Sequence, residues 1–531
     1  MKTDQSLTRR ELLQSSVLIA GGLSLSSIAH ADTGASSILQ TRAGKVAGVK
    51  SKGAHVFKGI PYGADTRATR FLPAAPPVAR KKTREALNYG PSCPQQSSRD
   101  SMSEDCLYLN VWTPALRDDG KRPIMVYFHG GEFSSGSGSS PLYDGTRLCL
   151  RGDVVVVTVN HRLNIFGHWY LPRWFGAKYA TSGNVGLLDL VQALTWVRDH
   201  AEAIGGDPQR VMVFGQSGGG AKIATLMAMP AAKGLFHRAA TMSGQQITAA
   251  GPRGATERAR TALETLKIAP GDIAKLNDVP TAGLVAATRA SDPSLVGRHL
   301  YFGPVLDEAS LSRHPFYPDA PAQSASIPMI IGNTLDETRA FNGNDPGIHE
   351  LTWEQLPDRL LPALHVDIQP EYVIREYRRL YPKYSATEVF FAATTAGRSW
   401  RGAVIEAELR AEQGSPVFAY QLNYRSPLEN GRYGAMHTMD IPLVFDNIAQ
   451  PESRTGTDEN AQKTADQMSE AFIAFARSGD PSHAGIPQWR PYELPARATM
   501  VFDAQSQVVN DPRGEERKLF AKVPYIQRGT Y

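Results

Sequence analysis

Continuous apolar runs alternate with amphipathic segments along most of this chain. Residues 124–128, 154–159 and 327–331 carry almost no polar side chain. Runs of this kind, without polar alternation, are typical of strands that are buried on both faces of a parallel sheet. Shorter strand-like segments are expected at residues 44–49, 56–60, 210–214 and 417–422.

Helical patterns lie between these strands. Leu187, Val191 and Leu194 are spaced to share one helix face, and Gly205-Gly206-Asp207-Pro208 ends that segment. Strands that alternate with helices predict an α/β fold with a central, mostly parallel sheet flanked by helices. No linker divides the chain. Further helices are expected at residues 221–229, 256–267, 403–413 and 461–477.

Composition indicates a globular protein with a large core. Of the 531 residues, 42% are hydrophobic and 21% are charged. The net charge of +5 is small and scattered, which argues against a nucleic-acid partner. The spacing of cysteine and histidine residues does not fit a structural zinc site, so no metal is expected.

The N-terminus resembles an export signal. Arg9 and Arg10 precede a mildly apolar stretch, and Ala29-His30-Ala31 fits a cleavage site. We therefore expect residues 1–31 to be a twin-arginine signal peptide and residues 32–531 to be one periplasmic or secreted domain. The apolar stretch is too short and too rich in Gly and Ser to span a bilayer, so no stable membrane insertion is expected. An amphipathic N-terminal helix is the alternative.

The cysteines agree with an oxidising compartment. Cys93 and Cys106 lie thirteen residues apart in a loop-like region, where export would favour a disulfide between them. A bridge over so short a loop would add about 3 kcal/mol of stability. Cys149 precedes an apolar strand and is expected to be a buried, inert thiol.

Residues 215–219, Gly-Gln-Ser-Gly-Gly, match G-x-S-x-G, the strand-to-helix turn that exposes a nucleophilic serine. A strand-like run precedes Ser217 and a helical segment follows it. Glycines suit a turn too tight for side chains beside the serine. A P-loop does not fit, because Lys222 comes one residue late and Ile223 replaces the metal-binding hydroxyl.

A serine nucleophile needs a base and an acid, which on such a sheet follow later strands. Asp336 and Glu337 come just after the strand at 327–331, and either could be the acid. His437 follows the strand at 417–422 and is the candidate base, with a solvated loop histidine as the alternative. Oxyanion donors are expected from the loop at 129–133 and from Gly218.

With these residues in place, the chain resembles the type-B carboxylesterases, the family that includes the cholinesterases. The similarity runs from about residue 44 to the C-terminus. It rests on five segments: residues 57–62 (FKGIPY), 103–112 (SEDCLYLNVW), 184–189 (NVGLLD), 475–481 (FARSGDP) and Trp489.

This resemblance implies an α/β-hydrolase fold with large insertions and a Ser–Glu–His triad. It selects Glu337 over Asp336 and supports His437 as the base. It places the Cys93–Cys106 bridge at the family's first disulfide. It also implies a hydrogen bond from Ser243 to the catalytic acid, and oxyanion donors at the residues Gly131, Glu132 and Gly218.

The chain departs from the family at several positions. Glu132 stands where the family has its third oxyanion glycine, so a Cβ restricts the backbone there. Gln216 replaces a glutamate beside the nucleophile, Asn164 replaces a glycine, and Thr338 replaces the glycine after the acid. We expect these changes to tune rate and substrate shape without abolishing activity.

The predicted function is an exported serine carboxylesterase that hydrolyses small ester substrates through an acyl-enzyme on Ser217. No cofactor is implied. A lipase acting on longer-chain lipid esters is the nearest alternative; aromatic residues at 166–175 could belong to its gorge or to the core. A non-catalytic cholinesterase-like binding protein is disfavoured, because such relatives lose triad residues and this chain keeps all three.

Overall fold

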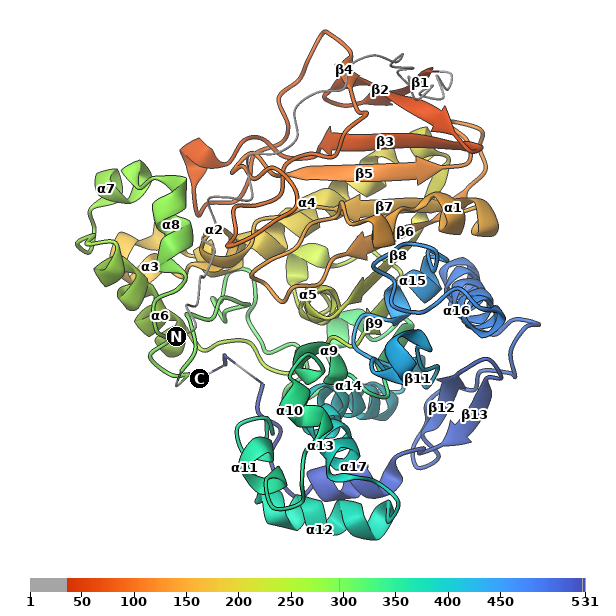
Figure 1. The fold of residues 1–531 in the computed structure, drawn as a ribbon. Coiled ribbons are helices and arrows are strands. Elements are labelled where there is room, and N and C mark those ends of the chain that lie inside the picture. The colour runs from red at the N-terminus through yellow and green to blue at the C-terminus, as the bar shows by residue number, and fades with distance from the viewer. Residues whose placement is uncertain (1–35, 296, 528, 531) are drawn as a thin grey trace, which may run out of the picture.

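The computed structural model describes residues 36–295, 297–527 and 529–530 of the chain (Figure 1). The predicted export segment, residues 1–31, lies outside these residues. One large twisted sheet runs through the described part and is covered by helices on both faces (Figure 1). The predicted α/β architecture is therefore confirmed.

The middle of the sheet is parallel. Its seven strands pair in parallel register from β7 to β12, and antiparallel strands extend the sheet at both ends. In spatial order the central strands are β7 (Val155–Val159), β6 (Arg122–Phe128), β8 (Gly206–Gln216), β9 (Arg238–Met242), β10 (Met329–Thr334), β11 (Val417–Leu422) and β12 (Ala498–Phe502). The outer strands are β1 (Ser36–Thr41), β2 (Gly44–Ser51), β3 (Ala54–Pro61) and β5 (Tyr108–Thr113) at one end and β13 (Gln507–Asn510) at the other; the short β4 (Arg84–Glu85) pairs with β2.

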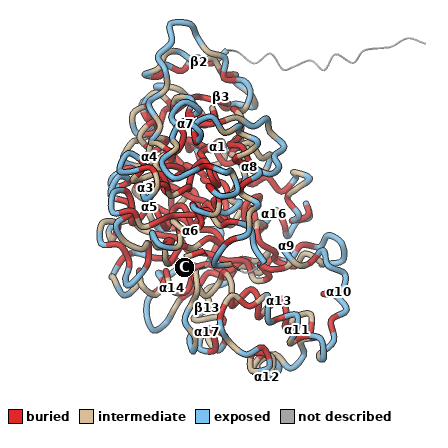
Figure 2. The backbone as a smooth tube through the Cα atoms, turned by 90° about the vertical axis from the view of Figure 1, so that its left-hand side faces the viewer, coloured by how far each residue is buried: buried red, intermediate tan, exposed pale blue. Residues whose placement is uncertain are grey.

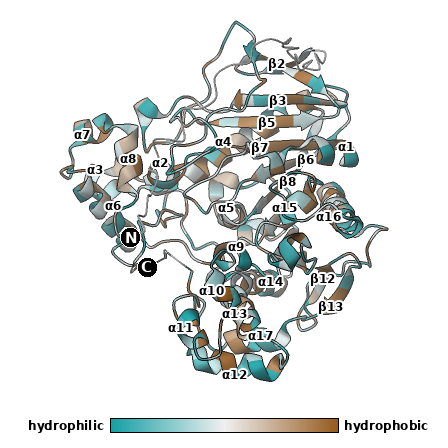
Figure 3. Cartoon of the chain, in the orientation of Figure 1, coloured by the Kyte–Doolittle hydropathy of each residue, from teal (hydrophilic) through white to brown (hydrophobic). Residues whose placement is uncertain are grey.

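The central strands are apolar on both faces because each face meets its own layer of helices. Along β6, Ile124, Val126 and Phe128 belong to one hydrophobic core, whereas Met125 and Tyr127 belong to the other. Figure 2 shows that the buried residues gather in the interior of the molecule, and Figure 3 shows hydrophobic residues along the strands in its middle. Two-sided burial explains why the sequence runs show no polar alternation.

The first face packs against helices α4 (Val185–His200), α5 (Gly218–Leu226), α6 (Pro252–Thr265) and α14 (Arg401–Glu412). The second face packs against α1 (Thr146–Gly152), α15 (Asp440–Val444) and α16 (Glu459–Ser478). No helix among the described residues combines the length and apolar character that crossing a bilayer requires. The aromatic residues Phe166, Trp169 and Phe175 are buried in the first core, so they are core residues.

A smaller group of helices has a hydrophobic core of its own. It is built from α11 (Leu356–Leu360), α12 (Pro370–Leu380), α13 (Ala386–Thr395) and α17 (Gly514–Phe520), and it lies at the bottom of Figure 1. We call this group the helical subdomain. The helical subdomain is joined to the main sheet through the turn Ala396–Trp400. This turn connects α13 to α14, and the three segments form one continuous helix.

The expected disulfide between Cys93 and Cys106 is not formed: both residues are buried free thiols. The Cys93 sulfur accepts a hydrogen bond from the Leu163 amide at 3.2 Å. A hydrogen bond with Cys93, together with burial, raises the pKa of Cys106 well above its usual range. Cys149 is a buried thiol in α1, as predicted.

A buried ion pair ties the loop after β7 to helix α4. The Arg162 guanidinium donates from Nε and Nη2 to the two carboxylate oxygens of Asp189, at 2.8 and 2.6 Å. The remaining guanidinium nitrogen, Nη1, donates to the Leu72 carbonyl. The side chains of Arg162 and Asp189 are both almost fully buried. With its donors paired, this ion pair holds α4 against the edge of the sheet that carries the candidate site.

We expect Asp189→Ala to lower the free energy of unfolding by about 3–5 kcal/mol, because it leaves a buried guanidinium without its counter-charge. Urea unfolding of the variant and the wild type measures this. The matched control is Asp319→Ala, which removes an exposed partner of Arg313 and should cost less than about 1 kcal/mol. Equal losses in the two variants would contradict a special contribution of the buried Arg162–Asp189 pair to stability.

Candidate active site

Ser217 is the only residue between strand β8 and helix α5. Its backbone has φ +56° and ψ −124°, a sparsely populated conformation that costs on the order of 1–3 kcal/mol in a residue with a side chain. Two contacts hold it: the Ser217 amide donates to the Met242 carbonyl at 2.7 Å, and the Ala221 amide donates to the Ser217 carbonyl at 3.1 Å. The turn exposes the hydroxyl at the end of the sheet.

Close backbone contacts explain the glycines after Ser217. A Cβ on Gly219 would overlap the carbonyl oxygen of Phe128, at the end of the neighbouring strand β6. A Cβ on Gly218 would overlap the backbone of Glu132. The start of α5 is therefore pressed against the loop after β6, the segment predicted to supply the oxyanion donors.

The candidate acid and base come from the loops after two neighbouring parallel strands. Glu337 follows β10 and His437 follows β11. A hydrogen bond joins His437 Nδ1 to Glu337 Oε2, and the His437 amide donates to the Glu337 carbonyl at 3.3 Å. Both side chains are buried. Parallel pairing brings the two loops to the same edge of the sheet, which is why residues 100 positions apart meet.

Asp336, the other acid that the sequence left open, is held by groups other than the imidazole. Its carboxylate accepts a hydrogen bond from the Ala435 amide at 3.0 Å and lies 3.5 Å from the guanidinium of Arg425. It thereby holds the loop that carries His437, while Glu337 contacts the ring itself.

Glu337 is completely buried, and burial alone would raise its pKa. The pKa is nevertheless lowered, because the His437 imidazole, the nearby Ser243 hydroxyl and the Thr334 amide at 2.8 Å stabilise the carboxylate. Ser243 lies close enough to contribute, although its hydroxyl meets no full hydrogen-bond geometry with any described residue. An ionised Glu337 accepts from Nδ1–H of His437, so Nε2 of the ring is an acceptor.

The acceptor nitrogen of His437 already has a partner. The side-chain amide of Gln216 lies with its Nε2 3.1 Å from His437 Nε2 and donates to it. The same nitrogen must accept the Ser217 proton if the serine is to be activated. Gln216 is one of the departures from the family pattern, and here it competes with the nucleophile for the base.

The loop after β6 is turned sharply at Gly131 and Glu132, which have φ +82° and +54°. The left-handed conformation costs about 1–2 kcal/mol at Glu132, where the family has glycine. Beneath the loop lies the buried Lys222, whose ammonium donates to the His129 carbonyl at 3.0 Å. Burial lowers the pKa of Lys222 to about 7, opposed by the nearby Glu132 carboxylate. This hydrogen bond ties Lys222 of α5 to the loop after β6.

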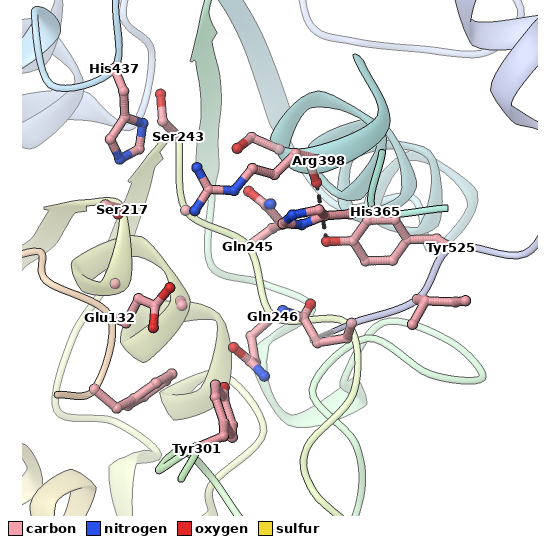
Figure 4. A pocket seen from close by; sticks show the side chains of 17 residues that line it. Glu132, Ser217, Ser243, Gln245, Gln246, Tyr301, His365, Arg398, His437 and Tyr525 are labelled. Carbon is pink, nitrogen blue, oxygen red and sulfur yellow. Dashed lines mark hydrogen bonds between the residues drawn. The ribbon is translucent and has the colours of Figure 1, made fainter. Parts of the chain in front are cut away.

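These groups surround one cavity of about 100 Å³ (Figure 4). Of the predicted residues, Ser217, His437, Ser243, Gly218 and Glu132 line it, while Glu337 lies buried behind His437. Gly131 adjoins Glu132 in the loop. Arg398 and His365 also line the cavity, on the wall formed by the helical subdomain. No local sequence signal pointed to these two residues, because each reaches the cavity only through tertiary packing.

Comparison with known proteins gives a consistent result. A model of the carboxylesterase family matches residues 35–520. The para-nitrobenzyl esterase of Bacillus subtilis (strain 168) is 34% identical over 498 residues, covering 91% of this chain and 98% of that protein. The phenmedipham hydrolase of Pseudarthrobacter oxydans is 32% identical over 502 residues, covering 89% and 97%.

Among solved structures, the carboxylesterase of Geobacillus stearothermophilus at pH 6.2 superimposes with a TM-score of 0.81 at 38% identity. It covers 91% of this chain and 99% of that one. The para-nitrobenzyl esterase structure gives a TM-score of 0.77 at 34% identity, with 91% and 99% covered. These similarities confirm the predicted α/β-hydrolase fold.

We expect Gln216→Glu to move the acid limb of the kcat/KM profile of a neutral ester upward by about one pH unit. A carboxylate beside His437 Nε2 favours the protonated imidazole, which cannot accept a proton, so a higher pH is needed to free the base. The control is Gln209→Glu, on an exposed position of the same strand. Identical profiles for the two variants would show that Gln216 does not contact the working base.

The Lys222→Met variant tests the lowered pKa of Lys222 through the pH dependence of the free energy of unfolding. The folded pKa of Lys222, about 7, lies below its ordinary value of 10.5, so the unfolded chain binds the extra proton between these limits. Wild-type stability should therefore rise relative to the Met variant from pH 7 to pH 10, by at least about 1 kcal/mol. Urea unfolding of both proteins at pH 7, 8.5 and 10 measures the difference. A constant difference would mean that the pKa of Lys222 is not lowered in the folded protein.

Proposed function

Because the chain belongs to the carboxylesterase family and is a carboxylic-ester hydrolase, we propose that it acts through an acyl-enzyme formed on Ser217. The observation that carries this proposal is the His437–Glu337 hydrogen bond beside a serine in a strained turn, all at one edge of the sheet. We further propose that the enzyme is exported, on the strength of Arg9-Arg10 and the Ala29-His30-Ala31 site.

In the first half of the reaction, Gln216 gives up its hydrogen bond to His437 Nε2, and that nitrogen takes the proton of the Ser217 hydroxyl. The serine oxygen attacks the ester carbonyl carbon, and the carbonyl oxygen becomes an oxyanion. Glu337 holds the Nδ1–H tautomer and stabilises the imidazolium. When the tetrahedral intermediate collapses, His437 returns the proton to the departing alkoxide and an alcohol leaves.

In the second half, water takes the place of the alcohol. His437 removes a proton from water, the hydroxide attacks the acyl carbon, and the Ser217 oxygen leaves with the proton as the carboxylic acid is released. The amides of Gly131, Glu132 and Gly218 are the proposed donors to the oxyanion in both halves. Each such donor contributes a factor of about 10²–10³ in rate.

The size of the cavity bears on the choice between an esterase and a lipase. About 100 Å³ is room for a short acyl or alcohol group, and the lining includes the polar side chains of Gln245, Gln246 and Ser399. Long lipid chains need an extended apolar groove. On the strength of this polar lining, and of the arginines that line the adjoining cavity of about 490 Å³, we propose that the enzyme acts on small esters.

The decisive experiment is a panel of 4-nitrophenyl esters of increasing acyl length, run on the wild type and on Ser217→Ala. We expect wild-type activity to be highest for short acyl groups. The variant should lose at least about 10³-fold in kcat, with its circular dichroism and unfolding curve retained.

A serine-directed organophosphate should abolish wild-type turnover, and its mass should be found on the peptide that contains Ser217. The matched control is Ser243→Ala, which keeps the nucleophile and should still be labelled. Full activity of Ser217→Ala, or labelling of that variant at the same rate, would refute the acyl-enzyme proposal.

A further inference from the structure

The helical subdomain places a cation beside the candidate nucleophile. Arg398 lines the cavity that contains Ser217, and its guanidinium extends toward Ser217 and His437 (Figure 4). The guanidinium carbon lies 3.9 Å from the centre of the Phe341 ring, and that ring lies 5.0 Å from the centre of the His437 ring. These two distances together limit the separation between the guanidinium and the imidazole to 8.9 Å.

Local backbone geometry directs Arg398 into the cavity. It lies in a π-helical turn, Ala396–Trp400, inserted between α13 and α14. The α13 side packs in the helical subdomain and the α14 side packs on the main sheet. The wider turn changes the direction of the side chains at this junction. Such turns are frequently found at functional sites.

His365 comes from a separate loop to the same place. Its neighbours Leu364 and Val366 are buried in the core of the helical subdomain, and His365 between them faces the cavity. Both His365 and Arg398 also line a second cavity of about 490 Å³. The two residues therefore mark the boundary between the space at Ser217 and the adjoining space.

The adjoining cavity is rich in positive charge. Arg298, Arg359 and Arg398 line it, against the single acid Asp345, which is paired with Arg359. On the nucleophile side, the Glu132 carboxylate belongs to the opposite wall from Arg398 (Figure 4). An anionic group in the substrate is thus attracted toward the side of the cavity that carries these arginines.

We propose that Arg398, with His365 beside it, binds a carboxylate of the substrate, so that the preferred substrates are esters that also carry a carboxylate. This inference rests on the proposed esterase function and specifies its substrate class. Arginine binds a carboxylate through two parallel N–H donors, which fixes orientation as well as charge.

The test compares three small esters of similar size. Monoethyl glutarate carries the carboxylate on the acyl side, 3-butyryloxypropionate carries it on the alcohol side, and ethyl valerate is neutral. We expect the wild type to hydrolyse one of the anionic esters with a kcat/KM at least tenfold above that of ethyl valerate. The side that shows the preference identifies which part of the substrate faces Arg398.

Arg398→Gln should lower the ratio of anionic to neutral kcat/KM at least tenfold, mainly through KM, and Arg398→Lys should restore part of it. Raising the salt concentration should weaken the wild-type preference, since the contact is charged. The matched control is Arg375→Gln, which removes an exposed arginine of α12 that lines neither cavity. Its ratio should equal that of the wild type.

The outcomes separate the two proposals. If the wild type hydrolyses 4-nitrophenyl esters but shows no preference for either anionic ester, the carboxylate site is refuted and the esterase proposal stands. An equal loss on all three esters in Arg398→Gln, without a change in the ratio, would also refute it, because a purely structural role gives that result. If none of the esters is hydrolysed, the proposed function itself fails.

Discussion

The direct passage from strand β8 into helix α5 at Ser217 is the constraint on which the rest of the site depends. A turn without spare residues forces the serine into a sparsely populated conformation and brings three backbones into contact. Phe128 limits Gly219, Glu132 limits Gly218, and Met242 accepts from the serine amide. These contacts hold the loop after β6 next to the Ser217 hydroxyl.

Electrostatics at this edge of the sheet follow from burial. Glu337 remains a carboxylate in the interior only because His437 and the Thr334 amide surround it with donors. The adjacent Asp440, also buried, has its pKa raised to about 7 by burial and by the charge of Glu337. The pKa values of two neighbouring buried acids thus shift in opposite directions because Glu337 has more donors around it, which is a general route to separate roles for two carboxyl groups.

Much of this arrangement could be predicted from the sequence, and the failures have physical causes. The strand at 417–422 and the buried runs that became β6 and β7 were found because two-sided burial leaves an apolar run. Strand β9 was missed because Arg238-Ala-Ala-Thr-Met is short and poor in β-branched residues. The disulfide prediction was wrong because spacing does not report the environment of a thiol. Arg398 and His365 could not be predicted as site residues. The direction of Arg398 depends on a π-helical turn, and that of His365 depends on the packing of its neighbours in the core of the helical subdomain.

The helical subdomain has a core separate from the two that support the sheet. The groups proposed for bond cleavage lie on loops of the sheet, whereas Arg398 and His365 belong to the subdomain and its junction. Changes in the subdomain can therefore accumulate without disturbing the strands beneath the nucleophile. Natural variation or directed evolution confined to residues 345–400 would then diversify which molecules are accepted, while the reaction performed on them stays the same.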